Sequence, residues 1–439
     1  MIEKLVTDEN GEAVSKRYRI DKSYTLQETK TLEKYDLNEE IKTITLEQDK
    51  IKDITFTNEL KKGQIRVIKV DLDNNEIRLK GIEFNVLDES GNIVDTLITD
   101  DNGEAISKLL RVNQKYTLQE TKTLENYVLN EETKVVTLQP AEITSITFEN
   151  EKIKGYIQVT KTSAEDNKYS ELPKGSPLPD VKFEVYDAED NLVDTITTDK
   201  DGKAITKELL KGYYKIKEIS SAKYYLLNTK IYDAEIVKDQ EIVNVDITND
   251  NVEIDVEIHK NGFIETQSKD DIFYNFKNIK NKSNVPLDNF TWSDHLPTDA
   301  VRINRLYTGT WNEDLKYDVY YKTNKTEEYV LFKEDLSTQI IYELNFKELK
   351  LDDDEYVTDY EFRFGKVKIG FQEVDSPILY CDILDGLGNG YVFTNKTKVK
   401  GNYFEKEVED NDDWTTITYF KEIKVEEVLP RTRFLVIWQ

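Results

Sequence analysis

Short runs of alternating apolar and polar residues recur along the first 251 positions of the chain. In residues 65–69 (IRVIK), 116–120 (YTLQE) and 146–150 (ITFEN), every second residue shares one face, because successive side chains of a strand point to opposite sides. Clusters such as DESGN, DDNGE and DKDGK separate the runs and are typical of turns. Many short strands at this spacing predict an all-β chain of tandem antiparallel β-sandwiches, arranged as an elongated array.

The alternating pattern is organised in internal repeats. VTDENGEAVSK, which begins at residue 6, returns as ITDDNGEAISK at residue 98 and more loosely as TTDKDGKAITK at residue 197. This pattern predicts domains at residues 1–60, 61–152 and 153–251. The first copy begins one third of the way into the repeat, so we expect it to be a partial domain that lacks its first strand.

In each complete repeat, three apolar stripes end in a polar residue that faces the same way as the stripe. These residues are Lys69, Glu120 and Asn150 in the second repeat, and Lys161, Glu218 and Asn249 in the third. The incomplete first repeat has two of the three, Glu28 and Asn58. One interpretation is that each stripe ends at a solvent-exposed rim. The recurrence of all three residues in both complete repeats favours burial, and a buried charge without a partner costs several kcal/mol.

Covalent chemistry offers one way to satisfy these groups. Burial lowers the pKa of a lysine and raises that of a carboxylic acid, which leaves a neutral, nucleophilic amine beside a neutral acid. Attack of Lys69 on the Asn150 amide, with Glu120 carrying the proton, would expel ammonia and form an isopeptide bond. The third repeat predicts the same reaction with Glu218 as the catalytic acid. Because Cys381 is the only cysteine, no intrachain disulfide can supply this stabilisation.

The third repeat carries the motifs GYIQVTK, GYYKIKEIS and VDITND in this order. They resemble the SpaA-type, or Cna protein B-type, domains of Gram-positive pilins and adhesin stalks. The resemblance implies Ig-like or prealbumin-like sandwiches with a first-strand Lys, a Glu after Tyr-x-x-x and a last-strand Asn. The first repeat keeps Glu28 and Asn58 but has no matching Lys. The Pro-Gly-Tyr that often follows the Glu is reduced here to its Tyr.

From residue 252 the repeats stop, and we expect a separate C-terminal β-sandwich over residues 252–425. Its motifs NKSNVPL and DHLP resemble conserved-repeat domains of bacterial surface proteins, and residues 300–385 exceed the usual length, which indicates an insertion. Lys260, Asp294 and Asn395 each end an apolar stripe and form a candidate third crosslink, assisted by Asp. The alternative is an exposed strand end at each position.

Charge and composition narrow the range of functions. A formal net charge of −27 disfavours nucleic acid and anionic lipid as partners and is typical of a well-solvated surface. The chain has two histidines and no apolar run long enough to span a membrane, and the acidic stretches LDDDE and DLDNNE are typical of solvated turns. We therefore expect no metal and no cofactor. Cys381, in the apolar run ILYCDIL, is predicted to be a buried thiol.

Residues 426–439 (EEVLPRTRFLVIWQ) contain Leu429, Pro430 and Thr432 in the arrangement Leu-Pro-x-Thr. This resembles a degenerate sorting signal, with Arg433 in place of the glycine that follows the threonine. The resemblance implies peptidoglycan anchoring by sortase in an intact homologue, and we expect this chain not to be anchored itself. The resemblance implies that the intact protein is extracellular and lies at the cell wall surface. Residues 1–13 contain no apolar run, so we expect this chain to lack a signal peptide.

The combined features predict a structural stalk or pilin-like surface protein that is no enzyme beyond its own crosslinking. Other pilin subunits are the expected partners. One alternative is an adhesin whose C-terminal domain binds a host matrix protein, using the aromatic segments around Trp292 and Trp311, although tryptophans of this kind are more often core residues. Another is a secreted enzyme, for which the sequence contains no convincing nucleophile–base pair, metal cluster or phosphate loop.

Overall fold

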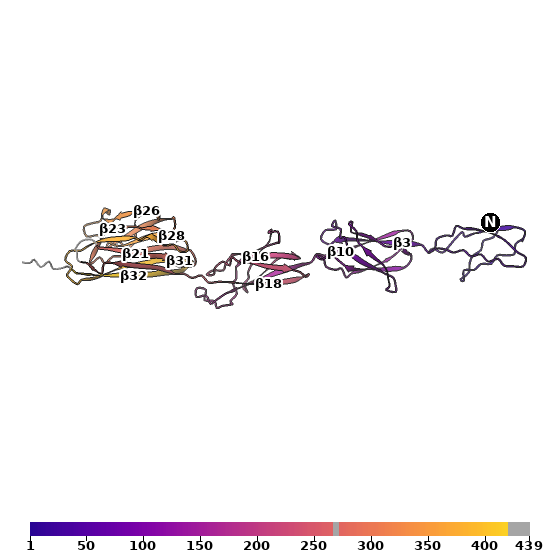
Figure 1. The fold of residues 1–439 in the computed structure, drawn as a ribbon, viewed down its shortest axis with the longest axis horizontal. Helices are drawn as coiled ribbons and strands as arrows, with labels where there is room; N and C mark the ends of the chain where they lie inside the picture. The colour runs from indigo at the N-terminus through magenta and orange to yellow at the C-terminus, as the bar shows by residue number, and fades with distance from the viewer. Residues whose placement is uncertain (267–271, 420–439) are drawn as a thin grey trace, which may run out of the picture. The chain divides into compact units, whose positions relative to one another are not determined.

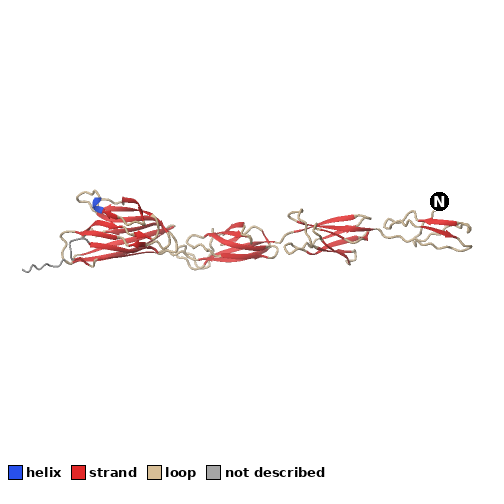
Figure 2. Ribbon diagram, turned by 45° about the horizontal axis from the view of Figure 1, so that its top comes forward, coloured by secondary structure: helices blue, strands red, loops and turns tan. Residues whose placement is uncertain are grey.

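The computed structural model describes residues 1–266 and 272–419 of the chain. Their regular structure consists almost entirely of β-strands, with a single 3-10 turn at Phe346–Glu348 (Figures 1 and 2). The chain forms two compact units. One comprises residues 1–160, 181–219 and 229–247, and the other comprises residues 161–180, 220–228 and the described residues from 248 onward. The expected all-β fold class with antiparallel sheets is confirmed.

Residues 1–60 contain one antiparallel pair of strands, β1 (Ser23–Gln27) and β2 (Ile41–Thr45). Alternate side chains of both strands are half-buried, as their period of two predicts. The segment 54–58 (ITFTN), whose alternating residues predict a strand ending at Asn58, does not form a strand. In the second repeat the matching strand is paired with the first strand of its domain, and residues 1–60 contain no counterpart of that pairing partner.

Residues 62–150 form a sandwich of two four-stranded sheets. One sheet contains β3 (Lys62–Asp71), β6 (Glu104–Ile106), β7 (Leu110–Arg111) and β10 (Ile143–Asn150). The other contains β4 (Glu83–Leu87), β5 (Ile93–Ile98), β8 (Lys115–Lys122) and β9 (Thr133–Thr137). Fully buried Ile65, Val67, Phe84, Leu118 and Phe148 fill the space between the sheets. The last strand, β10, lies parallel to the first strand, β3 (Figure 1).

Residues 154–249 repeat this arrangement. One sheet contains β11 (Lys154–Ser163), β14 (Lys203–Ile205), β15 (Leu209–Leu210) and β18 (Glu241–Asn249). The other contains β12 (Lys182–Tyr186), β13 (Leu192–Thr197), β16 (Gly212–Ser220) and β17 (Ile231–Ile236). Again the last strand, β18, pairs with the first, β11. The two complete repeats therefore bring the beginning and the end of each domain onto neighbouring strands.

The C-terminal domain has a five-stranded and a seven-stranded sheet. The first contains β19 (Val256–Gly262), β21 (Ile272–Asn281), β23 (Val301–Tyr307), β27 (Glu343–Asn345) and β30 (Ile378–Ile383). The second contains β20 (Glu265–Thr266), β22 (Leu287–His295), β25 (Lys316–Thr323), β26 (Val330–Ser337), β28 (Val357–Val367), β31 (Val392–Tyr403) and β32 (Lys406–Thr418). A small sheet pairs β24 (Thr310–Trp311) with β29 (Glu373–Asp375).

Residues 300–385, which were expected to hold an insertion, supply strands to both main sheets, including the central β28 and β30. This stretch is therefore part of the sandwich itself. Trp292 and Trp311 are buried, as expected of core residues, and each lies against several aromatic rings. Cys381 is also buried, in agreement with the prediction from its apolar surroundings in the sequence.

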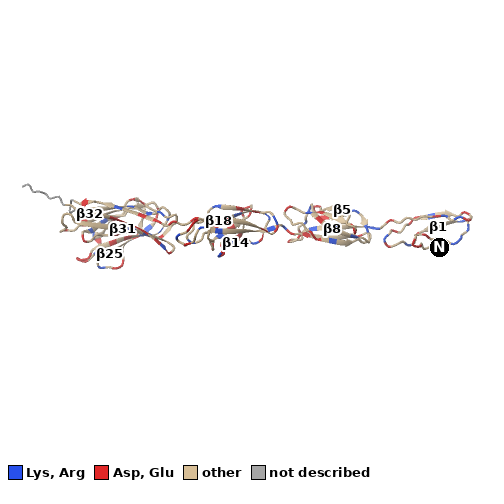
Figure 3. Ribbon diagram, turned by 90° about the horizontal axis from the view of Figure 1, so that it is seen from below, with Lys and Arg blue, Asp and Glu red and all other residues tan. Residues whose placement is uncertain are grey.

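Acidic and basic residues are interspersed over the strands and loops of the described chain (Figure 3). In most ion pairs among the described residues at least one partner is exposed, and in some both are, for example Lys80 with Asp101 and Lys215 with Asp190. Exposed pairs of this kind contribute little to stability, so the charge acts mainly to keep the surface solvated. Over residues 1–266 and 272–419, no helix has the length and apolar character needed to cross a membrane.

Candidate crosslinking sites

In the second repeat, the candidate residues converge between the two sheets. Lys69 lies on β3, and the parallel register places Phe148 of β10 opposite it. Asn150 is two residues further along β10 and therefore faces the same side. Glu120 reaches the same point from β8 in the other sheet, where it pairs with Phe84. The pairing geometry thus brings together two residues of one sheet and one of the other.

The polar atoms of these three side chains are in direct contact. The Lys69 amine donates a hydrogen bond to the side-chain oxygen of Asn150, and it lies 2.8 Å from Oε2 of Glu120. Nδ2 of Asn150 donates to Oε1 of Glu120 at 2.6 Å. The side chains of Lys69 and Glu120 are fully buried. Burial lowers the pKa of Lys69 and so favours its neutral, nucleophilic form.

A fourth residue, which the sequence pattern did not single out, completes this cluster. Thr123, the first residue after β8, accepts a hydrogen bond from Nδ2 of Asn150 at 2.6 Å. A hydroxyl residue stands three positions after the glutamate in all three repeats, as Thr31, Thr123 and Ser221. This spacing was available in the sequence. It was not recognised because it falls in the turn after the strand, where no face alternation applies.

The third repeat shows the same pairing between its first and last strands. The Lys161 amine on β11 donates to the side-chain oxygen of Asn249 on β18, and both residues are buried. Nδ2 of Asn249 donates to the hydroxyl of Ser221 at 2.9 Å. Glu218, near the end of β16, is buried as well, at the position that matches Glu120.

The C-terminal domain contains a buried set of a different kind. The Lys260 amine on β19 is hydrogen-bonded to Oδ2 of Asp294 on β22, and both side chains are fully buried. Asp294 pairs with Thr397 of β31, and Asn395 lies two residues from Thr397 on the same face. Asn395 is also fully buried. Burial lowers the pKa of Lys260 and raises that of Asp294, which favours the neutral amine and the neutral acid.

Comparison with known domain families agrees with the repeated architecture. A model of the SpaA prealbumin-like fold domain matches residues 1–60, 63–152 and 155–251, which together make up more than half of the chain. The chain belongs to the SpaA prealbumin-like domain family. Its three repeats are referred to below as the first, second and third SpaA domains.

Individual relatives of this SpaA-family chain match only parts of it. The trypsin-resistant surface T6 protein of Streptococcus pyogenes is 45% identical over 58 residues, which is 13% of this chain and 11% of that protein. The Bacillus anthracis TIE protein is 25% identical with a TM-score of 0.44, over 56% of this chain and 44% of that one. A streptococcal ancillary pilin has 20% identity and a TM-score of 0.22, over 52% of this chain and 75% of that one. The chain therefore spans about a tenth of the T6 protein and less than half of the TIE protein.

The first SpaA domain contains an incomplete version of the cluster. Asn58 donates to Oε2 of Glu28 at 2.6 Å and to the Thr31 hydroxyl at 3.2 Å. Glu28 and Asn58 are only half-buried. A backbone hydrogen bond from Asn38 is the main cause of a lowered pKa at Glu28, so its carboxylate is stabilised in the charged form. This cluster holds an acid and an amide without an amine beside them.

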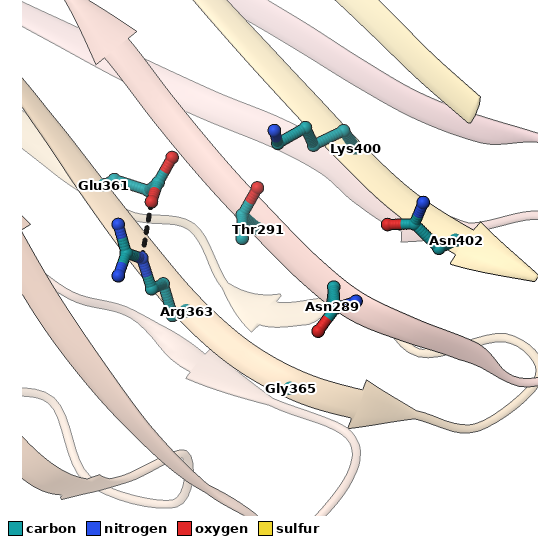
Figure 4. Close-up of a pocket in the computed structure, with 7 residues that line it drawn as sticks. All are labelled: Asn289, Thr291, Glu361, Arg363, Gly365, Lys400 and Asn402. Carbon is teal, nitrogen blue, oxygen red and sulfur yellow. Dashed lines mark hydrogen bonds and ion pairs between the residues drawn. The ribbon is translucent and has the colours of Figure 1, made fainter. Parts of the chain in front are cut away.

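The SpaA-family chain also has a polar depression on the seven-stranded sheet of its C-terminal domain, with a volume of about 420 Å³. Figure 4 shows side chains from β22, β28 and β31 around it, among them Asn289, Arg363 and Lys400. Arg363 is bonded to Glu361 at 2.6 Å and stacks on Tyr320 at 3.9 Å. Trp292 and Trp311 themselves are buried and are not part of an exposed aromatic surface. The adhesin hypothesis stays a prediction.

The remnant of a sorting motif at Leu429, Pro430 and Thr432 lies outside the residues that the structure describes. It stays a prediction.

Proposed function

We propose that this chain is a structural part of a pilin-type surface protein of a Gram-positive bacterium, stiffened by intramolecular Lys–Asn isopeptide bonds. Membership of the SpaA family supports the structural role, and the matching T6 relative is itself named as a surface protein. The contact between the Lys69 amine and the Asn150 side chain is the observation that carries the crosslink. The proposed crosslinked SpaA domains are residues 61–152 and 153–251. The proposed C-terminal domain is residues 252–425.

The reaction in the second SpaA domain begins with a proton transfer. The buried ion pair of Lys69 and Glu120 becomes a neutral amine and a neutral acid. Nζ of Lys69 then attacks Cγ of Asn150, while Glu120 hydrogen-bonds to the amide. The Nζ–Cγ bond forms and the Cγ–Nδ2 bond breaks. One proton passes from Nζ to Nδ2, with Glu120 as its carrier, and ammonia leaves.

The position of this bond has a mechanical consequence. It joins the end of β3 to the end of β10, two neighbouring strands that are the first and last of the domain. Tension that enters along β3 can then pass through the bond and leave along β10 without unfolding β4 to β9. The bond also closes a loop of 81 residues, for which chain entropy gives about 4.5 kcal/mol of stabilisation.

The same proposal extends to two further bonds. Lys161 and Asn249 would react in the third SpaA domain with Glu218 as the acid, because the amine contacts the amide oxygen there as well. Lys260 and Asn395 would react in the C-terminal domain with Asp294 as the acid. That bond would join β19 of the five-stranded sheet to β31 of the seven-stranded sheet, and so tie the two layers together.

Partners and location follow from this role. Other subunits of a surface polymer are the proposed partners, and the cell surface is the proposed location. No second function is favoured to the same degree, because the polar depression on the C-terminal domain offers no feature that selects a ligand.

Intact-mass measurement of the denatured full chain tests the proposal. We expect a mass lower than that of the sequence by one ammonia for each bond formed. Variants Lys69→Met, Lys161→Met and Lys260→Met should each restore one ammonia, after allowance for the side-chain change. Lys80→Met is the matched control, because Lys80 is an exposed lysine with an ordinary ion pair. A parent mass equal to that of the unmodified sequence would rule the crosslinks out.

A further inference from the structure

We propose that Thr123 is a positioning residue for the crosslinking reaction: its hydroxyl holds the Asn150 amide in the plane from which ammonia can leave. This inference rests on the proposed isopeptide function and adds to it a residue outside the Lys, Glu and Asn set. In the third SpaA domain, Ser221 takes the same role.

The hydrogen bonds of Asn150 carry this assignment. A carboxamide has two N–H donors and one oxygen acceptor. Its oxygen accepts from Lys69, and Nδ2 donates to Oε1 of Glu120 at 2.6 Å and to the Thr123 hydroxyl at 2.6 Å. The contacts with Lys69 and Glu120 set the orientation of the amide, with its oxygen toward the amine and its nitrogen toward the acid. The bond to Thr123 supplies the third point of attachment, and three points define the plane of the group.

The plane matters because an amine attacks a carbonyl carbon from above the plane of its substituents. Rotation of the carboxamide would turn the face of Cγ away from Nζ of Lys69 and reduce the fraction of productive encounters. A side chain that restricts this rotation therefore acts on the rate of bond formation. It has no need to exchange a proton itself.

The surroundings of Thr123 also suit departure of the leaving group. Thr123 is half-buried, and Asn150 borders an open depression of about 260 Å³ that is also lined by Leu72, Asn130 and Glu149. The Asn150 nitrogen donates to this half-buried hydroxyl, whereas its oxygen accepts from the buried Lys69 amine. We expect ammonia released at Asn150 to leave by the depression that this residue borders.

Recurrence in the other repeats shows that the hydroxyl, and not the threonine as such, is what is retained. Thr31 accepts from Asn58 at 3.2 Å and Ser221 accepts from Asn249 at 2.9 Å. The nearby Thr121 differs, because its hydroxyl donates to the backbone oxygen of Glu83. Thr121, two residues before Thr123 and near the end of β8, therefore offers a matched control.

The test follows the crosslink as the full chain is produced by cell-free synthesis. Samples are quenched in acidic denaturant at intervals and digested, and the linked peptide pair that contains Lys69 and Asn150 is quantified by mass spectrometry. Thr123→Val keeps the shape of the side chain but removes the acceptor. We expect linkage to slow about tenfold, the effect of one hydrogen bond that acts on the transition state. Thr123→Ser should restore the rate to within about twofold of the parent, and Thr121→Val should leave it unchanged.

A second measurement separates positioning from folding. In a Lys69→Met background no variant can form this bond, so the unfolding temperature reports the fold alone. We expect Thr123→Val to unfold in that background within a few degrees of its parent.

A linkage rate in Thr123→Val equal to that of the parent overturns the role of Thr123 and leaves the crosslink intact. Loss of the fold in the Lys69→Met background, or failure of Thr123→Ser to restore the rate, overturns it in favour of a structural role. A parent chain that never links overturns both proposals together.

Discussion

The Lys69 amine contacts the side-chain oxygen of Asn150 across two neighbouring parallel strands, the first and the last of their domain. Parallel pairing of these strands sets the register, since Asn150 follows the residue opposite Lys69 by two positions and so faces the same way. The acid comes from the opposite sheet, where Glu120 lies between the amine and the amide nitrogen. Each partner is thus held by a different strand, and the cluster forms only when both sheets have assembled.

Replacement of the acid tests its role as proton carrier. Glu120→Gln keeps the size of the side chain and one acceptor oxygen but cannot take up the lysine proton. We expect linkage of Lys69 to Asn150 to slow at least about a hundredfold, in the range for loss of a general acid–base group. The linked peptide pair from the second SpaA domain measures this. Glu83→Gln is the control, because the Glu83 carboxylate pairs with exposed Lys122 and not with the cluster, and it should react like the parent. An unchanged linkage rate in Glu120→Gln would exclude Glu120 as the proton carrier.

Single-molecule pulling tests the load path. In the parent, the bond would enclose the 81-residue loop between Lys69 and Asn150 and keep it from extending. In Lys69→Met we expect unfolding of this domain to release an additional length of about 280 Å, given the reach of an extended chain. The same extension in parent and variant would show that no covalent link spans the two strands.

The pH dependence follows from the direction of the shift at Lys69. Burial lowers the pKa of this amine below its ordinary value of 10.5, so a larger share of it is neutral near neutrality than for an exposed lysine. We expect the linkage rate to rise with pH and to fall as acidification protonates the amine. In Asn150→Ala, which cannot link, the unfolded chain retains the lysine proton to higher pH than the folded chain. The free energy of unfolding should therefore rise with pH between the two pKa values. A linkage rate that increases on acidification would contradict this assignment.

The C-terminal cluster makes a separate prediction. Asp294→Asn should abolish the bond between Lys260 and Asn395, because Asn cannot take up the proton that the buried amine must lose. The intact mass of this variant should exceed the expected crosslinked mass by one ammonia. Asp288→Asn is the control, since Asp288 is an exposed residue of the same strand with a long contact to Lys366. Equal ammonia loss in Asp294→Asn and Asp288→Asn would remove Asp294 from the reaction.

Strand periodicity was sufficient to predict which side chains of the SpaA domains face inward. Lys69, Glu120 and Asn150 end runs whose alternate residues are apolar, and the period of two fixes their side once one neighbour is known to be in the core. Thr123 was not predicted as a site residue because it follows the strand, where the path of the turn decides which atoms its side chain reaches. The sequence also did not predict that residues 300–385 supply strands to both main sheets, because pairing between distant strands such as β23 and β30 leaves no local pattern.

The first SpaA domain supplies an internal negative control. Its Asn58 is bonded to Glu28 and Thr31 much as Asn150 is bonded to Glu120 and Thr123, but no lysine of residues 1–60 contacts it. An acid and a hydroxyl without an amine cannot expel ammonia, so we expect Asn58 to remain an unmodified asparagine. Asn58→Ala should therefore change the intact mass of the chain only by the side-chain difference, whereas Asn150→Ala should also restore one ammonia. Peptide mapping that found Asn58 linked to any lysine of this chain would show that proximity in the folded domain does not decide which asparagine reacts.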